Sequence, residues 1–409
     1  MTTAPSLDLG LLLSAAEAAA PAEGVDAVAV ALSEMLGAKE VSFLIADISG
    51  GSLVRLTRAP RIGPAAQRAA HERVAIAGSA QGMTLRTQQV RQVPAPDGVW
   101  LYAPVTQRGE TVGVLELLLD GPVEPAVLES VSQAAHALAY VVIADRRYSD
   151  LYEWGERTSP LELSAEIQRR LLPTSYTCEA SQFSLSGWLI PANEAGGDTF
   201  DYILDRDTLH LSVTDAMGHG VEAAQLATLA VGSLRNSRRR GAGVVDMAQT
   251  ASWAVSEHGR LDQFVSGQVL RLDLASGTLE LVNAGHTSPL LVRDGVVLDL
   301  DLEADPPFGI WPTLPYQVQH RRLEPGDRLV LVTDGMYERN AEAAQIDTLL
   351  TTLADLHPRE TVQALTGAVL QATEGNVLDD ATALVLDWYG GPTRDRDAGD
   401  GAGIGLASD

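Results

Sequence analysis

The chain is poor in several residue types, and each scarcity excludes a class of protein. One cysteine, Cys178, stands among 409 residues, so an intramolecular disulfide is impossible and a cysteine-based metal site is not expected. Lys and Arg together number 29 against 54 Asp and Glu, which gives a formal net charge of -25. Because such a surface repels phosphate backbones and acidic membranes, we expect no nucleic-acid or membrane partner.

Long hydrophobic runs are missing too. No uncharged apolar stretch reaches the roughly 18 residues that a membrane-spanning helix needs. The run from residue 9 to 24 is apolar, but no Lys or Arg precedes it, and Asp8 and Glu17 interrupt it. We therefore predict a helix here rather than a signal peptide, and a cytoplasmic protein in a reducing compartment.

The first third of the chain predicts a sheet flanked by helices. Residues 40–58 and 100–119 each hold two apolar runs around a turn, at Gly50-Gly51 and at Arg108-Gly109, which predicts two antiparallel hairpins. Residues 9–36 and 124–148 have the apolar spacing of helices.

This pattern, with the central sequence LYAPVTQRGETVGVLEL, resembles a GAF sensory domain over about residues 8–145. The resemblance implies an N-terminal domain at residues 1–145 that either senses a ligand or acts as a dimerisation spacer. Since the region contains no cysteine, a thioether-linked chromophore is excluded.

Residues 146–175 are predicted to form a helical linker. Gly155 and Pro160 interrupt any continuous helix, and SPLE at 159–162 has the composition of a helix start. The new helix ends before Pro173 and carries an apolar stripe of Leu163, Ile167 and Leu171. Such a stripe packs either on the next domain or on its copy, and we predict a homodimer through this helix and the N-terminal domain.

Between residues 176 and 390, short strands alternate with helical segments. Hairpins are predicted at 268–286 and 289–300, the second around Asp294-Gly295, and helices at 221–239, 244–258 and 358–374. The pattern predicts an α+β fold of stacked antiparallel sheets covered by helices. The tail, residues 391–409, has no apolar periodicity and is expected to be disordered.

Aspartates recur in this region at strand ends or beside glycines. A strand alternating Leu209, Leu211 and Val213 leads to Asp215, which is followed by two glycines. Similar settings surround four further aspartates: Asp198, Asp334, Asp379 and Asp380. An aspartate near glycine is commonly a turn residue or a helix cap. Gathered together, these carboxylates would repel one another unless cations lay between them, and oxygen donors are what hard cations bind.

Five motifs, preceded by IQRRLLP, carry a specific resemblance: GGDTFDY, TDAMGHGVEAA, NAGHTSPLLV, LEPGDRLVLVTDG and DDATALVL. Over about residues 163–389 they resemble the bacterial SpoIIE-type (RsbU-like) phosphatases, which belong to the PPM class of metal-dependent serine/threonine phosphatases. The resemblance implies a layered α-β-β-α sandwich that binds two Mn²⁺ or Mg²⁺ ions. Family members often have an aromatic residue where Thr199 stands, and glycine where Ala216 stands.

The resemblance also implies roles for single residues. Asp215 would bridge the two ions, with the backbone carbonyl of Ala216 as a further ligand. Asp334 and Asp379 would complete the shell of the second ion, and Asp198 would hold the first, directly or through water. These four aspartates are the predicted catalytic residues. Asp380, beside Asp379, is the weakest member of the predicted metal set.

Two ions about 3.5 to 4 Å apart lower the pKa of a shared water and aim it at phosphorus, so Cys178 need not be a nucleophile. His219 is either an acid for the leaving seryl oxygen or an ordinary turn residue. For His286 we expect a local structural role near the site. Glu194 and Asp201 flank the first acidic loop, and either could support the ligands.

The predicted function is hydrolysis of phosphoserine or phosphothreonine. The resemblance implies that the substrate is a STAS-type anti-sigma factor antagonist, and we expect the N-terminal domain to control the reaction. One alternative is a phosphatase-like scaffold that has lost turnover. A remote alternative is a diguanylate cyclase, because AGGDTF resembles the GGDEF loop of those enzymes.

Overall fold

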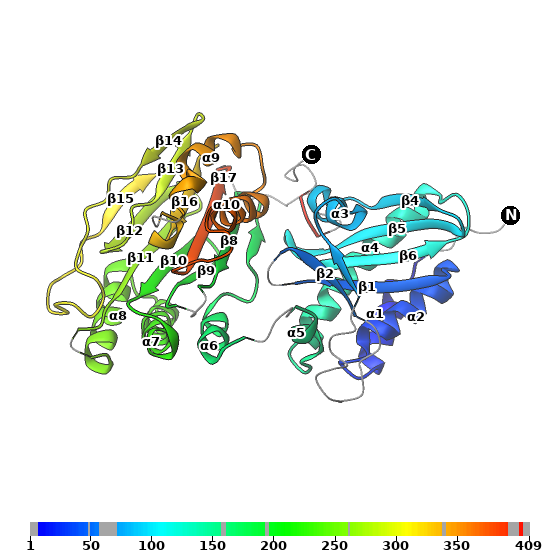
Figure 1. Ribbon diagram of the computed structural model, residues 1–409, viewed down its shortest axis with the longest axis horizontal. Coiled ribbons are helices and arrows are strands. Elements are labelled where there is room, and N and C mark those ends of the chain that lie inside the picture. The colour runs from blue at the N-terminus through cyan, green and yellow to red at the C-terminus, as the bar shows by residue number, and fades with distance from the viewer. Residues whose placement is uncertain are drawn as a thin grey trace. The chain divides into compact units, whose positions relative to one another are not determined.

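The computed structural model describes residues 7–47, 50–56, 72–156, 161–192, 196–260, 262–337, 341–391 and 401–403. The chain divides into two compact units (Figure 1): Met1–Pro160 with Arg396–Asp409, and Leu161–Asp395. The boundary between the two units falls within the predicted linker, residues 146–175.

The N-terminal unit is built on a six-stranded antiparallel sheet in the order β3-β2-β1-β6-β5-β4. Both predicted hairpins are confirmed, because β1 pairs with β2 and β5 pairs with β6. The strands are β1 Glu40–Ala46, β2 Ser52–Leu56, β3 Arg73–Ala75, β4 Arg91–Ala95, β5 Gly98–Gln107 and β6 Glu110–Leu119.

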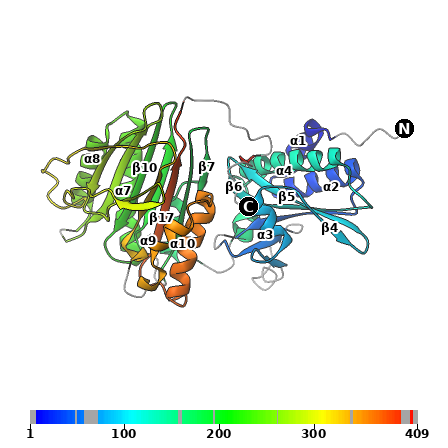
Figure 2. The same ribbon diagram turned by 90° about the horizontal axis from the view of Figure 1, so that it is seen from above.

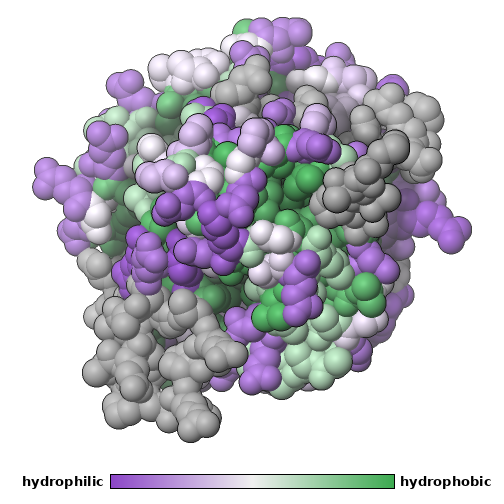
Figure 3. Space-filling view, turned by 90° about the vertical axis from the view of Figure 1, so that its right-hand side faces the viewer, coloured by the Kyte–Doolittle hydropathy of each residue, from purple (hydrophilic) through white to green (hydrophobic). Residues whose placement is uncertain are grey.

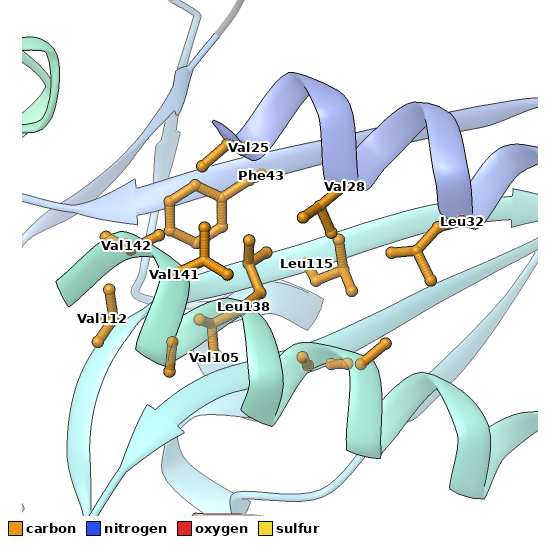
Figure 4. Close-up of a cluster of buried hydrophobic side chains, with 14 of the residues drawn as sticks. Val25, Val28, Leu32, Phe43, Val105, Val112, Leu115, Leu138, Val141 and Val142 are labelled. Carbon is orange, nitrogen blue, oxygen red and sulfur yellow. The ribbon is translucent and has the colours of Figure 1, made fainter. Parts of the chain in front are cut away.

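Three helices cover one face of this sheet: α1 Leu9–Ala18, α2 Gly24–Leu36 and α4 Pro125–Asp145. Figure 4 shows apolar side chains of α2 and α4 meeting Phe43 of β1 and Leu115 of β6. The Asp8 carboxylate begins α1 by accepting the backbone N–H groups of Gly10 and Leu11. A shorter helix, α3 Ala80–Thr87, covers the other face, where Leu85 packs on Leu44.

Helix α4 is long and apolar enough to cross a membrane, and among the described helices it alone meets that test. Its side chains at Val131, Leu138 and Val142 are buried in the core beside the sheet, as expected for the central helix of a folded domain. The α+β content and the one-sided helix layer agree with the predicted fold class, while the likeness to a GAF domain stays a prediction.

Two short helices lie where the linker was predicted. Gly155 does not break α5 (Leu151–Glu156); its missing side chain lets the helix approach the sheet, since a Cβ there would lie 2.6 Å from Ile45. Helix α6 (Leu163–Leu171) begins after Glu162, and residues 159 and 160 of the predicted start lie outside the described residues.

The buried face of α6 differs from the predicted stripe. Ser164, Gln168 and Leu171 point inward, whereas Leu163 is 64% exposed. The helix packs on α7 of the same unit, and Leu171 joins the core there. Gln168 is polar yet buried on this face because its side chain forms hydrogen bonds near the candidate site.

The C-terminal unit contains two stacked antiparallel sheets, in the orders β15-β12-β11-β10-β9 and β14-β13-β16-β17-β8-β7. Their long strands are β8 Phe183–Ile190, β9 Thr199–Leu204, β10 Thr208–Ala216, β11 Val265–Asp273, β12 Thr278–Ala284, β16 Arg328–Val332 and β17 Ala381–Trp388. The short ones are β7 Thr177–Glu179, β13 Leu290–Arg293, β14 Val296–Asp299 and β15 Gln319–Arg322. The predicted hairpins β11–β12 and β13–β14 are confirmed.

Strand alternation explains the layers of this sandwich (Figure 2). Leu209, Leu211 and Val213 of β10 point toward the second sheet and form the central core with leucines from β16 and β17. The outer faces are covered by α7 Gly220–Arg239 and α8 Val244–His258 on one side, and by α9 Ile346–Thr352 and α10 Pro358–Ala372 on the other. The unit is thus the α-β-β-α sandwich that the motifs implied.

At the end of the chain, most of the tail lies outside the described residues. Residues 401–403 are described, however, and Ala402 is only 3% exposed within the N-terminal unit. At these three positions the structure differs from the expectation of a disordered tail.

The predicted homodimer is not tested by a single chain and stays a prediction. The described surface of the N-terminal unit does carry exposed apolar side chains on its helices, among them Leu11, Leu13 and Val30. Figure 3 shows hydrophobic and hydrophilic side chains mixed on the face of the molecule turned to the viewer.

Candidate metal centre

Asp215 lies at the end of β10, one residue before that strand finishes. It continues the alternation of Leu209, Leu211 and Val213, so its side chain is on the face that looks into the sandwich. The strand thereby carries a carboxylate to the mouth between the two sheets, as the sequence predicted.

Asp198 reaches the same mouth from the loop before β9 and is 2% exposed. Its Oδ2 accepts hydrogen bonds from the hydroxyls of Thr333, at 2.7 Å, and Thr382, at 2.6 Å. Both threonines belong to the second sheet's region, so this carboxylate ties the first acidic loop to β16 and β17. Neither threonine had been singled out from the sequence.

The glycines of the GGD motif are required by close approach. A Cβ at Gly197 would lie 2.5 Å from the carbonyl oxygen of Ala216, and one at Gly196 would lie 2.8 Å from Oδ2 of Asp380. Real Cβ atoms do not approach other atoms so closely. Glycine at these two positions therefore lets the loop lie directly on the predicted carbonyl ligand and on the Asp380 carboxylate.

Asp334 and Asp379 approach from the second sheet. Asp334 is exposed and begins a short 3-10 turn, Asp334–Met336, directly after β16. Asp379 lies two residues before β17, and its carboxylate accepts the N–H of Asp380. Gly335 allows this close arrangement, because a Cβ there would be 2.0 Å from the carbonyl oxygen of Asp380.

The electrostatics show that these aspartates lie close together. Burial, followed by the charges of Asp334, Asp379 and Asp380, raises the pKa of Asp215 to about 7. Burial and the charges of Asp215 and Asp380 raise the pKa of Asp198 well above its usual range, against the effect of its threonine partners. Asp198 and Asp215 thus resist ionisation first because they are buried and then because their neighbours are acids.

Asp380 differs from the other four in its contacts. It is 1% exposed and accepts backbone N–H groups from Ala192, at 2.7 Å, and Gly196, at 3.0 Å. The side-chain amide of Gln168 donates to the same carboxylate and also, at 2.9 Å, to the backbone carbonyl of Asp198. With its oxygens engaged in this way, Asp380 holds the first acidic loop and helix α6 in place, while its role as a metal ligand stays a prediction.

The donor set suits a hard divalent cation. It consists of carboxylates and a backbone carbonyl, which are the ligands that Mg²⁺ and Mn²⁺ prefer. Within the described part of the chain, no Arg or Lys forms an ion pair with any of these five aspartates. No three of the described acidic, His or Cys side chains, however, meet closely enough to hold one ion as they stand. The repulsion that raises their pKa values is also a reason for the carboxylates to lie apart.

The other predicted residues fall into three places. His219 is exposed at the start of α7, near Asp379, whose pKa is raised chiefly by burial. Asp201 does not support the site, since its carboxylate is held by Arg235, at 2.9 Å, and Arg238, at 3.1 Å, on α7. Glu194 lies outside the described residues, and Cys178 is buried in the central core.

His286 is buried beside the centre. Its Nδ1 is hydrogen-bonded to the hydroxyl of Ser266 at 2.7 Å, and Ser266 pairs directly with Asp215 across β10 and β11. Its backbone N–H donates to the Asn283 side chain, the first residue of the NAGH motif. Burial lowers the pKa of His286 to about 4, so the ring is neutral. These contacts agree with the expected local structural role.

The comparisons with known proteins agree with these motifs. Residues 205–389 match the family model described as Stage II sporulation protein E (SpoIIE). The C-terminal unit is a SpoIIE-type phosphatase domain of the PPM class.

Two curated relatives of this SpoIIE-type domain come from Bacillus subtilis. The phosphoserine phosphatase RsbU is 22% identical over 238 residues, covering 56% of this chain and 70% of its own length. The phosphoserine phosphatase RsbP is 25% identical over 195 residues, covering 46% of this chain and 48% of its own length. The chain therefore spans 70% of the length of one of these relatives and about half of the other.

Among solved structures, the RsbU and RsbW domains of a Mycobacterium tuberculosis protein are 26% identical, with a TM-score of 0.47, covering 53% of this chain and 63% of that one. The phosphatase domain of SpoIIE from Bacillus subtilis, with a fragment of its regulatory domain, is 20% identical, with a TM-score of 0.45. That match covers 53% of this chain and 66% of the other.

Proposed function

We propose that this chain is a Mn²⁺- or Mg²⁺-dependent protein phosphatase that hydrolyses phosphoserine or phosphothreonine. The observation that carries the proposal is the gathering of four aspartates near strand ends at one edge of the sandwich, where burial and the neighbouring carboxylates raise the pKa of Asp215 to about 7. Asp198, Asp215, Asp334, Asp379 and the carbonyl of Ala216 would hold the cations. Bound there, two such ions supply Lewis acidity that activates water and neutralises phosphoryl oxygens.

The chain's own residues organise this centre. Thr333 and Thr382 hold one oxygen of Asp198, which leaves its other oxygen for a ligand role. His219, exposed near Asp379, is our candidate for the acid that donates a proton to the leaving oxygen. We assign the substrate, a phosphorylated STAS-type anti-sigma factor antagonist, by similarity to RsbU and RsbP.

The first test is phosphate release from an aryl phosphate and from a phosphoserine STAS protein, with Mn²⁺ or with a chelator. We expect release to require metal and to fall about 1,000-fold in Asp215→Asn, the loss of several kcal/mol of transition-state stabilisation. Asp262→Asn is the matched control, because this side chain is 73% exposed in the same unit. No release from folded, metal-loaded wild type would support the scaffold alternative instead.

We also propose that helix α6 transmits control from the N-terminal unit to the metal centre. The supporting contact is Gln168, which donates to both Asp380 and the backbone of Asp198. Arg235 of α7 adds a hydrogen bond to the carbonyl of Leu171 at the end of α6. A shift of this helix would therefore move two of the five aspartates together.

Gln168→Ala tests this control. We expect the Mn²⁺ concentration for half-maximal activity to change about 10-fold or more, since residues that support ligands act on metal affinity at this scale. Glu166→Ala, on the same helix and paired with the exposed Arg170, should leave it unchanged. Deletion of residues 1–158 without effect on turnover or metal dependence, under any activating condition, would contradict control by the N-terminal unit.

A further inference from the structure

The end of the chain returns to the N-terminal unit. Residues 401–403, with the sequence Gly-Ala-Gly, lie against the turn between β5 and β6. The backbone N–H of Gly109 in that turn donates to the carbonyl oxygen of Gly401 at 3.0 Å. All three residues are buried. A segment that follows the phosphatase domain in sequence is thus part of the other unit's fold.

The contact requires glycine at position 401. Gly401 has φ +96°, a region that side chains strain, and a Cβ would lie 2.1 Å from the carbonyl oxygen of Thr106 and 2.6 Å from Nδ1 of His136. Neither neighbour can easily move away. The first is strand backbone, and the imidazole of His136, on α4, is hydrogen-bonded through Nδ1 to the same Thr106 carbonyl at 3.0 Å.

The receiving surface is produced by an irregularity in the sheet. The register of β5 and β6 shifts between Val105 and Thr106, so the regular ladder is interrupted just before the turn. Backbone groups at an interruption of this kind need partners outside the ladder. Here the carbonyl of Thr106, at the shift, accepts a hydrogen bond from His136 of α4, and in the adjoining turn the Gly109 amide donates to Gly401 of the tail.

We propose that residues 401–403 are an intrachain ligand of the N-terminal unit, held against the β5–β6 turn and helix α4. The chain then joins the SpoIIE-type domain to the N-terminal unit at both of its ends. Because a tethered segment has a high effective concentration, one hydrogen bond and a small buried surface are enough for docking. The docking does not depend on the proposed phosphatase function.

The test is hydrogen–deuterium exchange of the full chain, followed in peptides that cover the β5–β6 turn. We compare wild type with Gly401→Val, and use Gly391→Val as the matched control. Gly391 also has a positive φ, +85°, but nothing lies within 4 Å of a Cβ there. Both variants therefore strain the backbone, and only Gly401→Val adds a clash with Thr106 and His136.

We expect Gly401→Val to raise exchange at the Gly109 amide by about three- to tenfold, the scale of one lost hydrogen bond. Ala402→Asp, which places a charge at a position 3% exposed, should do the same. Unchanged exchange in β8 and β17 shows that the variants are folded. Equal exchange at Gly109 in wild type and both tail variants would overturn the proposal, and so would an equal rise in Gly391→Val.

Discussion

Buried carboxylates in two regions of this molecule have neighbours of opposite charge. In the N-terminal unit, Glu116 on β6 is 2% exposed, and it accepts hydrogen bonds from Arg55, Ser42 and Gln81. In the metal centre, the neighbours that act on Asp215 are other aspartates, which raise its pKa. A buried ionised acid needs hydrogen-bond donors or a compensating charge. The N-terminal unit supplies both to Glu116 from its own sequence, whereas in our proposal the C-terminal unit obtains the charge from a bound cation.

The largest expected effect comes from removing the arginine that compensates the buried Glu116. Arg55→Met leaves Glu116 buried with its charge uncompensated, so we expect a loss of about 3–5 kcal/mol in the free energy of unfolding. Urea unfolding measured by circular dichroism checks this. Glu116→Gln combined with Arg55→Met should recover much of the loss, and a double variant as unstable as the single one would show that the pair is not what stabilises this face.

The second prediction concerns pH and the metal-free protein. The pKa of Asp215 is about 7 in the fold against 3.8 as its ordinary value, so the folded state holds a proton that the unfolded chain releases between these values. Metal-free protein should therefore lose about 2–4 kcal/mol of stability as pH rises from 4 to 7.

Thermal unfolding at pH 5 and pH 8, with chelator or Mn²⁺, measures this loss. We expect Mn²⁺ to raise the melting temperature more at pH 8, where the carboxylates are ionised. Asp215→Asn should remove most of the pH dependence in chelator, and a variant with wild-type pH dependence would contradict the assignment.

A third prediction separates the two neighbouring aspartates of the DD motif. Asp379→Asn removes a proposed ligand and should abolish most metal-dependent activity. Asp380→Asn keeps the size of the side chain but weakens its bonds to Ala192, Gly196 and Gln168, so we expect metal affinity to fall about 10–100-fold while saturating metal restores much of the rate. Titration of activity with Mn²⁺ distinguishes the two, and identical behaviour of both variants would make Asp380 a ligand as well.

The smallest effect is expected for an exposed ion pair. Arg170 and Glu166 are 3.2 Å apart on α6, with the Arg170 side chain 65% exposed. Arg170→Ala should change the free energy of unfolding by less than about 0.5 kcal/mol, because solvent screens such pairs. If Arg170→Ala lowered the free energy of unfolding as much as Arg55→Met, solvent exposure would not explain the difference between the two ion pairs.

Local patterns in the sequence were sufficient for much of the fold. Alternating leucines on β10 placed Asp215 at a strand end, and Asp294-Gly295 predicted the tight turn of β13–β14, where both residues have positive φ. Periodicity failed on α6, because its buried face carries Gln168, whose partners are more than 25 residues away in sequence. No pattern within a helix can reveal an interaction of that kind.

The motifs likewise led to the aspartates but not to their separate roles. Asp201 and Asp380 are both buried acids near the centre, yet arginines of α7 hold Asp201, while backbone amides and Gln168 hold Asp380. Thr333 and Thr382, which fix Asp198, gave no signal that sets them apart from ordinary strand threonines.

The sequence by itself determined the strands, the helices and the set of acidic strand ends, because residue periodicity, turn chemistry and short motifs are encoded locally. Only the tertiary structure decided which carboxylates lie together, which of them is held by backbone amides, and where Gly401 docks. These outcomes depend on contacts between segments far apart in sequence, 212 residues in the case of Gln168 and Asp380. Such distances arise from the packing of two sheets, which no single segment specifies.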